Sequence, residues 1–224
     1  MGTGCEPLVC GAPAAEFHLR NDLSGGAADV VFRYGKRYVT PGQNVTPRVV
    51  SDSPIVGDWD GDGVETVGVA RFIARCGVSG GDVIGCTGPQ RIHWHLRNSN
   101  TAGPADMDFH YGEGFAQPVV GDWDGDGTTT IGVTLPDQRQ ERWMLRNSNA
   151  GGRAEFDYLF GSHTPFPLVG DWDGDGDDTA GVIHRSDQTR WSLKNDHGAG
   201  AADVELHYGR EADRFLIGQR SRTE

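Results

Sequence analysis

The heptapeptide Gly-Asp-Trp-Asp-Gly-Asp-Gly occurs three times in the sequence, starting at Gly57, Gly121 and Gly170. In each copy the aspartates occupy alternate positions, which places their carboxylates on one concave side of a tight loop, and the glycines allow the backbone to turn. Carboxylate oxygens at this spacing suit a hard cation, and Ca²⁺ is the first choice. A solvated acidic turn is the alternative, but in such a turn no bound cation would offset the repulsion between the three carboxylates.

Two further signatures recur between the heptapeptides. One is an aromatic residue followed by x-Leu-Arg-Asn or x-Leu-Lys-Asn, and the other is an alternating run that ends in Tyr-Gly or Phe-Gly. The sequence therefore contains four repeats, with a parent length of about 49 residues, the distance from Gly121 to Gly170. The first signature starts at Phe17, Trp94, Trp143 and Trp191, and the second ends at Gly35, Gly112, Gly161 and Gly209.

Each repeat is predicted to form four short strands: the apolar run before the heptapeptide, the Gly-Val run after it, the Trp-x-Leu strand and the run ending in Tyr-Gly or Phe-Gly. About 40–50 residues with four strands, repeated along a chain, are typical of β-propeller blades. We therefore expect an all-β fold, a single propeller domain over residues 1–224 with four blades. The repeats are residues 1–53, 54–117, 118–166 and 167–213.

The ends of the chain indicate how the ring closes. The first repeat lacks its Asp loop and first strand, whereas residues 214–218 supply a spare strand with no Asp loop after it. We expect this strand to complete the first blade, so that pairing of N- and C-terminal strands closes the ring and covers two sheet edges. A ring completed by a second chain and an open array are the alternatives.

Composition limits the classes of partner. The net charge of −12 argues against nucleic acid, and no apolar stretch reaches membrane-spanning length. The four cysteines form two close pairs, Cys5/Cys10 and Cys76/Cys86, without C-x-x-C spacing. We read them as two disulfides formed in an oxidising compartment, with free buried thiols as the alternative. Residues 75–90, around the second pair, are an insertion that serves either as a recognition hairpin or as a decorative loop.

These repeats resemble the FG-GAP/VCBS superfamily, whose integrin α-subunit members form Ca²⁺-binding propellers, and more closely the bacterial GDWDGDG repeats common in secreted actinobacterial proteins. The resemblance covers residues 17–217 and implies about three Ca²⁺ ions and an extracellular location. With loop positions counted from the first aspartate of each heptapeptide, it implies side-chain ligands at positions 1, 3 and 5 and a carbonyl ligand at position 7. These positions are Asp58, Asp60, Asp62 and Val64; Asp122, Asp124, Asp126 and Thr128; and Asp171, Asp173, Asp175 and Asp177.

The sequence departs from this family at loop position 9, where a carboxylate ligand is expected and threonine stands in each loop. The preceding residue, at position 8, is an acid in two loops and is therefore a candidate ligand there: Glu65 and Asp178. The middle loop has Thr129 at position 8 and so lacks a fourth carboxylate. We expect it to bind Ca²⁺ most weakly.

Two further groups of side chains are candidates for binding a ligand or a metal. Polar and aromatic residues recur at the ends of the Trp-x-Leu strands and are candidates for glycan binding, with turn formation as the alternative: Trp94, Arg97 and Asn98; Trp143, Arg146 and Asn147; Trp191, Lys194 and Asn195. His93 and His95 share one face of a strand and His110 lies on the next, a set that could bind zinc. Exposed polar strand residues are the alternative, because the other repeats do not keep these histidines.

The sequence contains none of the common catalytic signatures of serine hydrolases, zinc proteases or phosphate-binding loops. By analogy of fold, the resemblance implies a non-enzymatic, calcium-stabilised extracellular module, acting as a monomer, that binds a glycan or a protein. A propeller hydrolase or lyase acting on polysaccharide is one alternative. A scaffold subunit in a secreted toxin or protease assembly is another.

Overall fold

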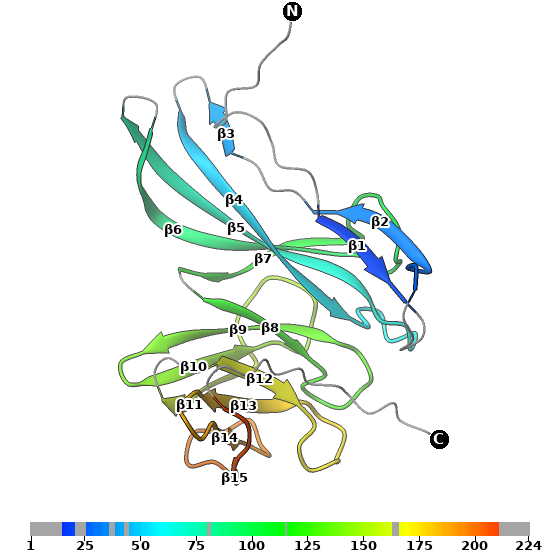
Figure 1. The fold of residues 1–224 in the computed structure, drawn as a ribbon, viewed down its shortest axis with the longest axis vertical. Coiled ribbons are helices and arrows are strands. Elements are labelled where there is room, and N and C mark those ends of the chain that lie inside the picture. Colours follow the sequence, from blue (N-terminus) through cyan, green and yellow to red (C-terminus); the bar gives the residue numbers. More distant parts are fainter. Residues whose placement is uncertain are drawn as a thin grey trace, which may run out of the picture. The chain divides into compact units, whose positions relative to one another are not determined.

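The computed structural model describes residues 15–20, 26–35, 39–42, 45–79, 82–114, 116–162 and 166–210. Every regular element in these ranges is a β-strand, and the strands form antiparallel sheets (Figure 1). The described chain contains no helix of sufficient length and apolar character to span a membrane. The predicted all-β class is confirmed.

The third and fourth repeats each form a four-stranded sheet in which neighbours in sequence are neighbours in space. This arrangement confirms the four predicted strands for both repeats. The third repeat contains β8 (Gln117–Gly121), β9 (Thr130–Asp137), β10 (Gln140–Leu145) and β11 (Phe156–Ser162). The fourth contains β12 (Phe166–Gly170), β13 (Thr179–His184), β14 (Arg190–Leu193) and β15 (Val204–His207).

The second repeat differs from this plan because its sheet has five strands. These are β3 (Val39–Gly42), β4 (Val45–Gly57), β5 (Thr66–Ser79), β6 (Asp82–Leu96) and β7 (Met107–Glu113). The strand before the first Asp loop thus begins ahead of the predicted repeat boundary at residue 53, since β4 begins at Val45 and pairs with β3. The β-branched residues before position 53 extend the strand instead of forming a connection.

The insertion at residues 75–90 extends the β5–β6 pair into a long hairpin (Figure 1). The backbone register places Cys76 opposite Cys86. A disulfide across this hairpin stays a prediction, and so does the choice between a recognition element and a decorative loop. Cys5, Cys10 and the expected closing strand at residues 214–218 lie outside the described residues.

The first repeat contributes β1 (Ala15–Leu19) and β2 (Val30–Tyr34), which pair with each other. All four repeats share one register at the start of the Trp-x-Leu strand, where the aromatic residue faces the same position of the following strand. The pairs are Phe17–Phe32, Trp94–Phe109, Trp143–Tyr158 and Trp191–Leu206. The sequence repeat is thus also a structural repeat.

The chain divides by its contacts into two compact halves. The first half comprises Met1–Val56 and Glu65–Gly114, and the second comprises Gly57–Val64 and Phe115–Glu224. The first Asp loop, which follows β4, thus groups with the third and fourth repeats.

Each half buries its apolar residues between the sheets of consecutive repeats. In the second half, Tyr158 and Phe160 of the third repeat join a cluster with Ala180 and Val182 of β13. In the first half, equivalent positions are used: β2 supplies two aromatic residues, and β5 supplies two valines. Those residues are Phe32, Tyr34, Val67 and Val69.

Candidate functional site

The three Asp loops share one hydrogen-bonded form. In the second loop, Asp122 at position 1 accepts hydrogen bonds from the amides of Asp126 at 3.0 Å and Gly127 at 2.8 Å, and Asp126 accepts one from Thr128 at 2.7 Å. Bonds of the same kind hold the first and third loops. In each loop an oxygen from each of the three aspartates lies within 4.8 Å of the other two.

Glycine at loop positions 4 and 6 is required by backbone conformation rather than by space. Gly125 and Gly127 have φ values of +70° and +92°, at which residues other than glycine are strained. A Cβ atom at Gly127 would meet nothing within 4 Å. The heptapeptide glycines therefore fix the turn that gathers the carboxylates.

The pKa values of two loop carboxylates are raised above their usual range. Burial raises the pKa of Asp122, and the charges of Asp124 and Asp126 act in the same direction against the backbone hydrogen bonds. In the third loop, a hydrogen bond with Asp175 and then burial raise the pKa of Asp177 to about 6. A divalent cation bound by carboxylate oxygens would offset the like-charge repulsion, so the acidic triplets could hold a metal ion.

In the second and third loops, the residue at position 8 contacts the preceding loop. Thr129 donates its amide to the carbonyl of Asp58 at 2.7 Å, and the Asp58 amide donates to Thr129 Oγ1 at 3.1 Å. Asp178 repeats this exchange with Asp122, at 2.6 Å between backbone atoms and 3.0 Å to Asp178 Oδ2. We call these two reciprocal pairs, Asp58–Thr129 and Asp122–Asp178, the loop clasps. They join successive Asp loops in series.

The clasp gives Asp178 a contact that the sequence does not indicate. The candidate ligand of the third loop directs one carboxylate oxygen to the amide of Asp122 in the second loop. The middle loop thus has a carboxylate beside it, supplied by the next repeat. The expectation that this loop binds Ca²⁺ most weakly stays a prediction. It was based on the absence of a fourth carboxylate among the loop's own residues and did not include Asp178.

Removal of the clasp carboxylate gives the first testable prediction. Asp178→Ala should destabilise the fold by about 1–3 kcal/mol, because the Asp122 amide is left without its charged acceptor. Asp187→Ala is the matched control, since Asp187 is an exposed aspartate between β13 and β14, outside the Asp loops and the clasps. It should change stability by less than about 0.5 kcal/mol. Urea titration in Ca²⁺ measures both, and equal losses would contradict the clasp.

Two residues that the sequence did not single out form hydrogen bonds to carbonyl groups of the Asp loops. Asn149 donates Nδ2 to the carbonyls of Thr129 at 2.9 Å and Trp59 at 3.3 Å. At the same repeat position, His197 Nε2 lies 2.8 Å from the carbonyl of Trp123. Because a carbonyl only accepts, this His197 nitrogen carries the proton. Their recurring position could have identified them from the sequence, since each stands six residues after the tryptophan of its Trp-x-Leu strand, as Asn100 does.

The tryptophans of the Trp-x-Leu strands, which are candidates for glycan binding, have a structural role. Trp94 and Trp143 are fully buried, and each donates Nε1 to a carbonyl of the next strand, that of Tyr111 at 2.9 Å or Phe160 at 3.2 Å. Trp191 makes the equivalent bond to Tyr208 at 2.9 Å. These contacts favour packing over ligand binding.

The basic residues after these strands hold the following turn. Arg146 bonds to the Arg153 carbonyl, to Ser148 Oγ at 2.7 Å and to Glu155 at 3.5 Å. The next amide, that of Asn147, donates to Glu155 Oε2 at 3.2 Å. Comparable bonds engage Arg97, Asn98, Lys194 and Asn195. The turn interpretation therefore has direct support in every repeat that carries an Asp loop.

The three histidines of the second repeat lie together, as strand alternation predicts. His93 contacts the rings of both His95 and His110, with centroid distances of 4.2 and 4.1 Å. Asp108 bonds to His93 Nε2 and lies 3.0 Å from His95 Nδ1. Burial lowers the pKa of His95, and the charges of Arg71 and His93 act in the same direction. The neutral imidazole is thereby favoured.

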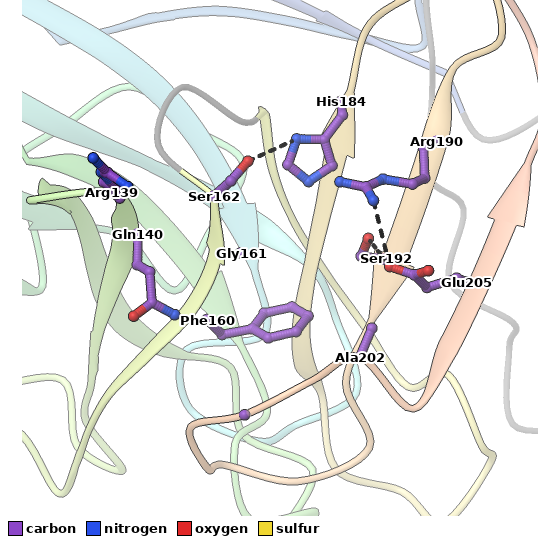
Figure 2. A pocket seen from close by; sticks show the side chains of 11 residues that line it. Arg139, Gln140, Phe160, Gly161, Ser162, His184, Arg190, Ser192, Ala202 and Glu205 are labelled. Carbon is purple, nitrogen blue, oxygen red and sulfur yellow. Dashed lines mark hydrogen bonds and ion pairs between the residues drawn. The ribbon is translucent and has the colours of Figure 1, made fainter.

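The second half contains an open cleft of about 250 Å³ between the sheets of the third and fourth repeats (Figure 2). Ser162 and His184 are hydrogen-bonded across it at 3.2 Å, and Glu205 contacts Ser192 at 3.2 Å and Arg190 at 3.8 Å. Burial, and then the charge of Arg190, lower the pKa of His184. The lining is completed by Arg139, Gln140, Phe160, Gly161, Gly200 and Ala202.

This cleft joins side chains that no single repeat contains, and the sequence analysis did not single it out. It offers guanidinium, amide, imidazole, hydroxyl and carboxylate groups to a ligand, with the Phe160 ring in its lining. Such a set can hydrogen-bond a polyhydroxylated molecule from several directions. Comparisons of the chain with family models, curated proteins and solved structures find no match.

Proposed function

We propose that this chain is a non-enzymatic, extracellular binding module in which calcium ions stabilise a β-propeller and a cleft between repeats binds a glycan. The observation that carries the proposal is the series of Asp loops joined by clasps, because it couples the first and second acidic loops to the repeat that follows each. Ca²⁺ in a loop would then stabilise the contact between two sheets as well as the loop itself.

The propeller arrangement is supported by the repeated packing between consecutive sheets. Aromatic residues on the last strand of one repeat contact the Gly-Val strand of the next repeat in both halves of the chain. In the fourth repeat the corresponding positions, on β15 and directly after it, are exposed: Val204, Leu206 and Tyr208. A further blade would cover them, either by closure of a four-blade monomer or through a second chain. The molar mass in solution distinguishes these two arrangements.

The loop residues would hold calcium through oxygen atoms alone. Asp124 at position 3 is the candidate that reports most directly on the metal, because the residues at positions 1 and 5 also accept backbone hydrogen bonds that shape the loop. The carbonyl at position 7 is the further expected donor. Calcium supplies positive charge at the centre of each loop, and sites of moderate affinity are filled at extracellular Ca²⁺ concentrations.

Glycan is the ligand class that the cleft lining favours. Its side chains are mostly polar, they come from neighbouring sheets, and the cleft is open to solvent (Figure 2). A protein partner would instead call for a broad apolar surface. The Ser162–His184 pair is the observation that favours a hydrolase, but no carboxylate among the described residues hydrogen-bonds to His184. The base of such a pair would need that third group to orient it.

A glycan array, run with Ca²⁺ and with a chelator, tests this function. Binding should require Ca²⁺, and Arg139→Ala should weaken it about tenfold, because a charged donor is lost from the cleft. Arg153→Ala is the matched control, since Arg153 is exposed and does not line the cleft. Turnover of a polysaccharide, or binding that is indifferent to Arg139, would refute the proposal.

A further inference from the structure

The histidine cluster of the second repeat brings metal-binding groups together from two strands. His93 and His95 on β6 face His110 and Asp108 on β7, because the register pairs His93 with His110 and His95 with Asp108. A ring nitrogen of each β6 histidine and a carboxylate oxygen of Asp108 all lie within 4.8 Å of one another. This spacing allows one ion to contact all three side chains after small side-chain rotations.

The equivalent positions in the third and fourth repeats hold an ordinary cross-strand ion pair. In the third repeat, Arg142 binds Asp157 through two hydrogen bonds of 2.7 and 2.8 Å. In the fourth repeat, Arg190 lies 3.8 Å from Glu205. The second repeat keeps the acid, as Asp108, but replaces the permanently charged arginine with an imidazole. A neutral imidazole leaves this carboxylate without a fixed positive charge.

A second observation concerns the neighbouring imidazole. The Nε2 atom of His95 is buried and has no hydrogen-bond partner among the described residues. A buried ring nitrogen without a partner is costly. The other ring nitrogen, Nδ1, is the one 3.0 Å from Asp108, so a turn of the ring would bring Nε2 to an ion held by Asp108. Arg71, the nearby cation, is held by Asp52 through bonds of 2.8 and 3.0 Å, so its charge is already compensated.

We propose that His93, His95 and Asp108 bind one divalent transition-metal ion, with Zn²⁺ as the ion that best suits the donors. Two imidazole nitrogens and one carboxylate oxygen match zinc and are poor ligands for Ca²⁺, which distinguishes this site from the Asp loops. Three protein ligands leave a coordination position open for an external group. The three side chains are 22%, 14% and 55% exposed, so such a group can reach the ion.

The experiment is calorimetric titration of the full chain with Zn²⁺ in buffer that contains excess Ca²⁺ to occupy the Asp loops. The wild type should bind one Zn²⁺ at this site. His93→Arg should lower the affinity at least about tenfold, because it removes a ligand. This variant restores the cation–carboxylate pair of the sister repeats and should therefore fold.

Matched controls separate the site from other histidines. His207→Ala removes the histidine that stands in the fourth repeat where His110 stands in the second, and it should leave Zn²⁺ affinity unchanged. With Cu²⁺ as a spectroscopic probe, electron paramagnetic resonance should reveal two coordinated imidazole nitrogens in the wild type and one in His95→Ala. No calorimetric Zn²⁺ site under excess Ca²⁺, or equal affinity in His93→Arg and the wild type, would overturn the proposal.

Discussion

Chelation of calcium is expected to lower the melting temperature of the protein by about 10 °C or more. A ligand present at a hundred times its Kd contributes about 2.7 kcal/mol of stability per site. For a chain of this size each kcal/mol corresponds to about 2–4 °C. Three loops carry the same carboxylate arrangement, so their losses accumulate. Thermal unfolding in Ca²⁺, and again in an excess of chelator, measures the difference.

A single loop can be tested without disturbing its backbone. Asp124→Asn should reproduce part of the loss in Ca²⁺ and show a smaller further change on chelation, because it removes a central carboxylate. Asp187→Asn makes the same charge change at an exposed position in the β13–β14 turn and should have no effect. A melting curve that is the same with and without calcium would exclude the metal from the stability of the fold.

Truncation of the buried tryptophan of the third repeat is expected to cost about 3–5 kcal/mol. Trp143 is fully buried in the cluster between two sheets, and its Nε1 hydrogen bond satisfies the carbonyl of Phe160. Trp143→Ala would leave a cavity and an unpaired carbonyl. Urea unfolding in Ca²⁺ measures the change in free energy.

Two further variants separate packing from hydrogen bonding. Trp143→Phe keeps most of the buried ring and loses only the hydrogen bond, so it should cost clearly less than the alanine variant. Trp191→Ala loses an equivalent hydrogen bond, to Tyr208, from a side chain that is not fully buried and should also cost less. If Trp143→Ala left stability unchanged but abolished ligand binding, the tryptophan would be a ligand platform instead.

Local sequence signals determined the repeating part of this protein. The strands follow from two-residue alternation and the loops from Gly-Asp spacing, and both depend only on neighbouring residues. Thus β8 to β15 and the carboxylate triplets lie where the sequence predicts them. The addition of β3 and the early start of β4 were not predicted, because pairing partners rather than local pattern decide where a strand ends.

Only the tertiary structure decided which contacts are made by the residues that differ between repeats. Thr129 and Asp178 contact loops 71 and 56 residues earlier, so their role depends on how one repeat packs on another. The cleft between the third and fourth repeats and the grouping of His93, His95 and Asp108 across two strands arise in the same way. A repeat pattern specifies each sheet, whereas contacts between sheets and between strands place the polar side chains that can bind a ligand.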